Sequence, residues 1–381
     1  MRMIEPNEFD DSKIAYLLNK LQRYGDINSR ILGALINYDD TENMLNFLKK
    51  RFSLLISYLV RPEPLGLQLY FIEGFLHPLV HLVDIYDILD GFPGAILKNS
   101  YSPDESITFL WIPQGYESSF KRILDELESR DLLRYSRINK IQETLQFLYD
   151  FSSYDFSLGR YKDDFLVSQR RPMYLPDLSD GFKPDMLDLS IIGIKQMHNT
   201  LSLKQVAEIM GVKYRTVLKH YHEHLIGKGI ITGFMVRLNG GKHTRLSIIF
   251  DNEDLLHDLT RIPTLTHVYK LRDGTFYAAI FPEDNMIQPI LKYISELKYN
   301  LNVSAKVMAH PFMPRFEYLL TASIPYEHFT TTGKWEVDEE KMLMNIEKVE
   351  RKLMEGKSKL TSTPEISLFK KNMVNISNKL N

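Results

Sequence analysis

Cationic and hydroxyl side chains follow one another at helical spacing in the second half of the chain. Arg215, Lys219 and His222 fall at i, i+4 and i+7, so they form one row on a helix, with Thr216 and His220 beside it. Guanidinium and ammonium groups can meet guanine edges or phosphates, and a threonine can meet a thymine methyl group. The row therefore predicts a helix that contacts the major groove of double-stranded DNA.

Three helices and a wing are expected to position this row. Apolar residues at helical spacing predict a first helix over 187–197, and Ser202 opens a second helix with Gln205 completing a capping box. Gly211 supplies the turn to the third helix. A glycine-rich extended segment then predicts a basic wing. The predicted DNA-contacting residues are Ser202, Lys204, Lys213, Tyr214, Arg215, Thr216, Lys219, His220, His222, and, on the wing, Arg237 and Lys242.

The next segment predicts a split α/β unit. Its hairpin is signalled by Arg272-Asp273-Gly274, because Asp-Gly readily adopts positive φ. The order strand, helix, strand, strand, helix, strand is ferredoxin-like. The expected elements are strands over 246–250, 265–271, 275–281 and 304–309, and helices over 253–261 and 284–300.

With these elements in view, MGVKYRTVLKHYHEHLIGKGIITGF (210–234) and the following unit resemble the leucine-responsive (Lrp/AsnC) family of archaeal and bacterial transcription regulators, over about 187–312. The resemblance implies a third helix in the major groove and an α/β (RAM) domain that dimerises. By position, it assigns DNA contact to Lys213, Arg215, Thr216, Lys219 and His220. Lys213 departs from the family, which usually has a capping serine there. The hairpin lacks a clear effector-binding glycine pattern, so any small-molecule effector stays unknown.

The same order of elements recurs more faintly at about 10–142, where 102–105 is the expected hairpin turn. Acidic residues open its third helix, so the helical domain of this copy is expected to be mainly structural. The predicted class is α+β, with winged helix-turn-helix and ferredoxin-like RAM-type domains in two tandem copies. The expected divisions are 1–64 (degenerate helix-turn-helix), 65–149 (first RAM-like domain), 150–185 (connector), 186–244 (winged helix-turn-helix), 245–313 (second RAM-like domain) and 314–381 (C-terminal helix and tail).

Composition narrows the classes of function. The 381 residues carry a net charge of -2, so DNA affinity must come from a local basic surface rather than from the global field. The chain has no cysteine, which excludes disulfides, thiolate metal sites and cysteine nucleophiles. No apolar stretch has membrane-spanning length and the acidic N-terminus lacks a signal sequence, so a cytoplasmic protein without membrane contact is expected.

The histidines of the chain allow two other chemistries, metal binding and proton transfer. The pairs His220/His224 and His77/His81 lie at i, i+4, but no third ligand is tied to either by spacing, so no metal or other cofactor is expected. Siroheme decarboxylases share a related two-part architecture, and His77, His81 and His310 would then act as acid or proton shuttle. A scaffold without DNA affinity is the other alternative. The preferred prediction is a homodimeric, sequence-specific DNA-binding regulator that is not an enzyme.

Overall fold

The computed structural model describes residues 10–354, apart from 26–28, 167–168, 176, 179–180, 242 and 312–317. It is a mixed α+β structure with antiparallel strand pairs, which confirms the α+β part of the predicted class. The chain forms two compact units, each assembled from three segments. Among the described residues, no helix is long and apolar enough to cross a membrane. Unit 1 comprises 1–60, 142–175 and 231–309, and unit 2 comprises 61–141, 176–230 and 310–381.

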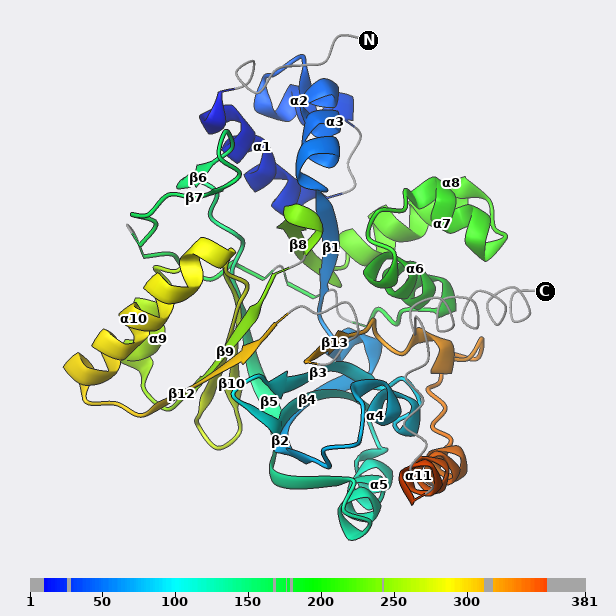
Figure 1. The fold of residues 1–381 in the computed structure, drawn as a ribbon. Coiled ribbons are helices and arrows are strands. Elements are labelled where there is room, and N and C mark those ends of the chain that lie inside the picture. Colours follow the sequence, from blue (N-terminus) through cyan, green and yellow to red (C-terminus); the bar gives the residue numbers. More distant parts are fainter. Residues whose placement is uncertain are drawn as a thin grey trace. The chain divides into compact units, whose positions relative to one another are not determined.

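Unit 2 contains a sheet in the order β13-β3-β4-β2-β5 (Figure 1). Residues 102–105 do not form the expected turn: they belong to β4, where Glu105 pairs with Phe75 of β2. The turn composition of Ser-Pro-Asp is outweighed by pairing along a long neighbouring strand. The bounds are β2 Leu67–Leu76, α4 Leu82–Ile88, β3 Pro93–Asn99, β4 Ser102–Pro113, α5 Glu117–Ser129, β5 Leu133–Gln146 and β13 Leu319–Thr321, with 3-10 turns at Glu63–Leu65 and Tyr326–His328.

The C-terminal helix α11 (Glu339–Met354) completes the core of unit 2. Met342, Ile346 and Val349 form its apolar stripe, and they pack in one buried cluster with residues of α4 and α5. Polar contacts flank the stripe, since Asn345 Nδ2 donates to the Asp87 carbonyl at 2.8 Å and Arg130 bonds to Glu350. The apolar stripe of α11 is thus covered within its own unit.

Unit 2 also contains the three-helix segment. The second helix begins with the predicted capping box, in which the Gln205 amide donates to Ser202 Oγ at 3.3 Å, and Gly211 ends it with φ of +66°. Lys213 precedes the third helix without a side-chain cap. That helix then continues as a π-helix. The bounds are α6 Met186–Met197, α7 Leu203–Met210, α8 Tyr214–Lys219 and the π-helix η3 His220–Ile226.

In unit 1, a two-stranded sheet pairs segments that are far apart in sequence. β1 (Leu55–Val60) runs antiparallel to β8 (Ile231–Arg237), with Leu55 opposite Arg237. β8 therefore pairs with the strand that follows the N-terminal helices, and α1 packs against it. The remaining short elements of this part are α1 Asp11–Tyr24, α2 Ser29–Ile36, α3 Thr41–Phe52, β6 Tyr154–Asp155 and β7 Arg160–Tyr161.

The second sheet region of unit 1 has the order β12-β9-β11-β10, and α9 and α10 lie side by side along it (Figure 1). The predicted Asp-Gly hairpin joins β10 to β11, with φ of +86° at Gly274. The order of elements matches the one expected from the sequence. The bounds are β9 Arg245–Phe250, α9 Glu253–Leu259, β10 Leu265–Leu271, β11 Phe276–Ile280, α10 Asp284–Leu301 and β12 Ala305–His310, preceded by a 3-10 turn at Asn239–Gly241.

Candidate functional site

One face of the strands β9, β11 and β10 carries a group of polar side chains. The registers place Ser247 opposite Ala279 and Ala279 opposite His267, while Tyr277 lies opposite Tyr269. Alternate residues of a strand point to the same face. These side chains, together with Arg245 at the start of β9, therefore share one face, whereas the intervening positions are apolar. We name Arg245, Ser247, His267, Tyr269 and Tyr277 the polar sheet face.

Hydrogen bonds and ring stacking connect the polar sheet face. Arg245 Nη2 donates to the Tyr277 hydroxyl at 2.8 Å, and the Ser247 and Tyr277 hydroxyls are 2.6 Å apart. Tyr269 stacks between His267 and Tyr277, with ring centroids 5.7 and 6.0 Å away. Arg245, Ser247 and Tyr277 are buried. A connected array of this kind holds a guanidinium group and three rings in fixed orientations.

Burial sets the charge state of this face. It lowers the pKa of His267 to about 4, with a smaller contribution from the positive charge of Arg245. It raises the pKa of Tyr269 to about 12. At neutral pH, His267 is therefore a neutral imidazole beside a guanidinium group, and a bound anion would reverse part of that shift.

A second guanidinium group lies in the same unit. Arg237, at the end of β8, donates from Nη2 to Ser57 Oγ at 3.3 Å, while its Nε has no hydrogen-bond partner among the described residues. No carboxylate of the described residues lies within salt-bridge distance of it, and burial lowers its pKa. The Tyr149 hydroxyl interacts electrostatically with both Arg237 and Arg245. A buried cation without a carboxylate partner is costly, and an anionic ligand would offset that cost.

The carboxylate of this region is Glu283, directly before α10. Asn239 Nδ2 donates to both of its oxygens at 3.2 Å, and His243 Nδ1 lies 3.5 Å from Oε2. Burial raises the pKa of Glu283 to about 7 and lowers that of His243. Glu283 is therefore partly protonated near neutrality and supplies little negative charge. The arrangement as a whole suits an anion with acid–base groups nearby.

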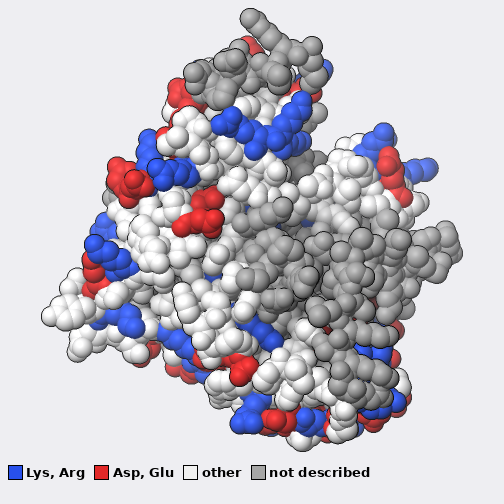
Figure 2. All heavy atoms as spheres, in the orientation of Figure 1, with Lys and Arg blue, Asp and Glu red and all other residues white. Residues whose placement is uncertain are grey.

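The residues predicted to contact DNA fall into three groups. Ser202, Lys204, Lys213, Tyr214, Arg215, Lys219 and His222 are exposed on α7, α8 and η3, with Thr216 half-buried. Charges of both signs lie over this segment (Figure 2), since Glu208 of α7 and Glu223 of η3 are exposed as well. His220 turns toward Asp188, with Nδ1 2.9 Å from Oδ1, and Arg237 lies within the β1–β8 pair. Lys242 lies outside the described residues.

The histidines of the alternative decarboxylase hypothesis, His77, His81 and His310, belong to unit 2, whereas the polar sheet face belongs to unit 1. His310 is fully buried in unit 2, where its Nδ1 lies 2.6 Å from the Lys98 carbonyl. His77 Nδ1 accepts from the Leu79 amide at 3.3 Å, and the His81 amide donates to Asp84. His267, Tyr269 and Tyr277 were assigned no role from the sequence. The sequence shows no regular alternation over 265–271, and the one available signal was the spacing of two between His267 and Tyr269, which places both rings on the same face of a strand.

Comparisons with known proteins give a limited result. No family model matches the chain, and no curated protein matches it. The solved structures that it is similar to include the siroheme decarboxylase NirDL, at 10% identity and a TM-score of 0.47, covering 89% of this chain and 99% of that chain. A second is the same protein in complex with an iron-uroporphyrin III analogue, at 10% identity and a TM-score of 0.41, covering 90% and 99%.

These findings correct the sequence-based assignment. The matched structures are those of a decarboxylase, and no family model or curated protein supports an Lrp/AsnC transcription regulator. The predicted membership of that family, the sequence-specific DNA-binding function, the double-stranded DNA partner and the exclusion of an enzyme were therefore wrong. An exposed basic helix face is common on surfaces of many functions, which is why its residues misled the prediction.

Proposed function

We propose that unit 1 carries an enzyme site that binds a polycarboxylate and removes one carboxyl group as CO2. The observation that carries the proposal is the guanidinium group of buried Arg245 beside His267, which burial holds neutral, together with half-buried Arg237, since both arginines interact electrostatically with Tyr149. Guanidinium groups bind carboxylates with two parallel hydrogen bonds. A buried site also removes water from the carboxylate that must leave, and this favours loss of its charge.

The polar sheet face supplies the proton that the reaction requires. A substrate carboxylate paired with Arg245 offsets the smaller of the two causes that lower the pKa of His267, and its own negative charge favours the protonated ring, so that His267 can relay a proton from water. The bond between carbon and carboxylate then breaks, CO2 leaves, and the electron pair stays on carbon. That carbon takes the proton from His267. The step consumes one proton and changes no oxidation state of the protein.

The substrate class follows from the number of cations. Two guanidinium groups on different strands suit a ligand with more than one carboxylate, and the flat rings of Tyr269 and Tyr277 suit an aromatic body. An iron-uroporphyrin has both properties and is the ligand class named for one similar structure. It is therefore the first substrate to test.

The test is turnover with iron-uroporphyrin III, in which the substrate is incubated with the chain and loss of CO2 is followed by mass spectrometry. His267→Asn keeps a similar size but removes the proton donor, so turnover should fall roughly 100- to 10,000-fold. His257→Asn is the matched control, because His257 is exposed in the same unit. No turnover by the unmodified chain, or equal turnover by the His267 variant, would refute the proposed reaction.

We also infer that the chain consists of two tandem copies of a winged helix-turn-helix and a RAM-like domain. The order α1, α2, α3, β1 followed by β2, α4, β3, β4, α5, β5 has a counterpart in α6, α7, α8, β8 followed by β9, α9, β10, β11, α10, β12. The pairing of β1 with β8 supports the inference, because these strands hold equivalent places in the two copies. The divisions at 64, 149, 185, 244 and 313 remain proposed boundaries.

A further inference from the structure

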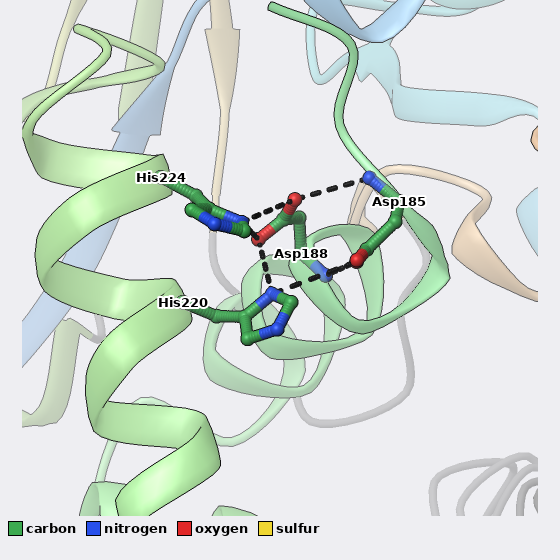
Figure 3. Close-up of side chains that lie close together, drawn as sticks. All are labelled: Asp185, Asp188, His220 and His224. Carbon is green, nitrogen blue, oxygen red and sulfur yellow. Dashed lines mark hydrogen bonds and ion pairs between the residues drawn. The ribbon is translucent and has the colours of Figure 1, made fainter.

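The two ends of the three-helix segment in unit 2 bring four potential metal ligands together. Asp185 and Asp188 lie at the start of α6, and His220 and His224 lie on the π-helix η3. One donor atom from each residue lies within 4.8 Å of every other. Figure 3 shows the two imidazole rings and the two carboxylates pointing toward one another. The cluster is separate from the polar sheet face, which belongs to unit 1.

The donor spacings fit a small metal ion. His220 Nδ1 lies 2.9 Å from Asp188 Oδ1 and 3.6 Å from Asp185 Oδ1, and His224 Nδ1 lies 3.1 Å from Asp188 Oδ1. Around tetrahedral Zn²⁺, with ligand bonds of about 2.0 to 2.2 Å, neighbouring donor atoms are roughly 3.3 Å apart. The observed spacings lie on both sides of that value, so small side-chain movements would complete the coordination.

The charges of the cluster also favour a cation. Asp188 is buried, with a side-chain exposure of 1%, and the two histidines are its only ion-pair partners among the described residues. The imidazole rings are centred 4.3 Å apart, so a positive charge on both would be unfavourable. A divalent cation replaces both Nδ1 protons and balances the two carboxylates without that repulsion.

The surroundings hold the ligands in place. The Asp185 amide donates to Asp188 Oδ2 and the Asp188 amide donates to Asp185 Oδ1, each at 3.0 Å, so the capping box of α6 orients both carboxylates. The Phe182 ring packs against His224 at 5.2 Å. Asp185 is exposed and leaves an entry path for the ion. Hydrogen bonds of this kind from outside the ligand set commonly orient metal ligands.

We propose that Asp185, Asp188, His220 and His224 bind one divalent transition-metal ion, with Zn²⁺ as the best-fitting ion. Two imidazole nitrogens and two carboxylate oxygens are a ligand set that Zn²⁺ accepts. With four protein ligands the site is closed and therefore structural rather than catalytic. The ion links the start of α6 to η3, and so fixes the first helix of this segment against the third.

Titration of the untagged, metal-free chain with Zn²⁺ by calorimetry tests the proposal. One tight ion per chain is expected, and the Tm of the chain should rise with Zn²⁺. The double substitution His220→Ala with His224→Ala should abolish the tight site. His222→Ala is the matched control, because His222 is exposed on the same π-helix and should leave binding unchanged.

Two further measurements keep the test decisive if the double variant unfolds. Asp185→Asn changes an exposed ligand and retains a side-chain oxygen for the cap, so it should fold and weaken Zn²⁺ binding at least about tenfold. In the unmodified chain, Zn²⁺ should shift the Nδ1 resonances of His220 and His224 and leave those of His222 in place. Absence of a tight ion, or unchanged affinity in the Asp185 variant, would overturn the metal site.

Discussion

Glu283→Gln should remove a pH-dependent loss of stability from unit 1. Burial raises the pKa of Glu283 from 4.5 to about 7, because the ionised form loses its water shell, and its side-chain exposure is only 15%. The folded chain therefore holds this proton more tightly than the unfolded chain does. The resulting stabilisation is present below pH 4.5 and is lost as the pH rises through 7.

The size of the effect follows from the shift. A rise from 4.5 to about 7 corresponds to a loss of about 3 kcal/mol in the free energy of unfolding between low and high pH. A carboxylate before a helix N-terminus such as that of α10 gains only about 0.3 to 1 kcal/mol from the helix dipole, so burial dominates. Glutamine is always neutral and keeps an oxygen for Asn239. At pH 5 the variant should be as stable as the unmodified chain or less stable. From pH 5 to pH 8 the unmodified chain should lose about 3 kcal/mol of unfolding free energy that the variant keeps.

Urea unfolding between pH 5 and 8, followed by circular dichroism, measures this difference. Tryptophan fluorescence is unsuitable, because Trp111 and Trp335 both belong to unit 2. Glu253→Gln is the matched control, since the Glu253 side chain is 78% exposed in the same unit. If the Glu283 variant and the unmodified chain change in parallel over this range, burial of the Glu283 charge is not what the structure indicates.

Two other substitutions test the packing inside each unit, both by urea unfolding. Ile346→Ala removes a fully buried side chain of the α11 stripe and should lower the free energy of unfolding by about 2 to 5 kcal/mol. Met344→Ala, at a position 61% exposed, is the control and should change stability by less than about 0.5 kcal/mol. Equal effects would mean that α11 does not pack on α4 and α5. Tyr277→Phe removes the hydroxyl between Arg245 and Ser247 and should lower the free energy of unfolding by about 1 to 3 kcal/mol. Tyr299→Phe, at a position 87% exposed, is the control and should leave stability unchanged. A Tyr277 variant as stable as the unmodified chain would argue against the hydrogen-bonded array.

Local signals in the sequence were sufficient for much of the fold. The capping box at Ser202, the glycine at 211 and the Asp-Gly hairpin were predicted correctly, because each depends on residues within four positions of one another. The segment 102–105 was misassigned, since its turn composition is local but its pairing with β2 is not. The partner of β8 was also beyond local reasoning, because β1 lies far away in the sequence.

The candidate sites depend even more on distant residues. Spacing revealed the His220/His224 pair, but Asp185 and Asp188 join it only because α6 packs against η3. The link between Arg245 and Tyr277 likewise arises from the register of β9 with β11. The sequence interpretation relied on the exposed cations of α8, placed Arg237 on a DNA-contacting wing and assigned no role to Arg245. Burial, which decides whether a cation needs a ligand, could not be seen in residue spacing alone.

Binding of iron-uroporphyrin III is the most direct test of the central claim, that the polar sheet face holds a polycarboxylate. The visible absorbance of the ligand is titrated with the unmodified chain, with Arg245→Gln, and with Arg272→Gln as the control from the exposed hairpin of the same sheet. Saturable binding that weakens at least about tenfold in the Arg245 variant and is unchanged in the Arg272 variant is the predicted result. Absent binding, or equal affinity for all three proteins, would contradict the account.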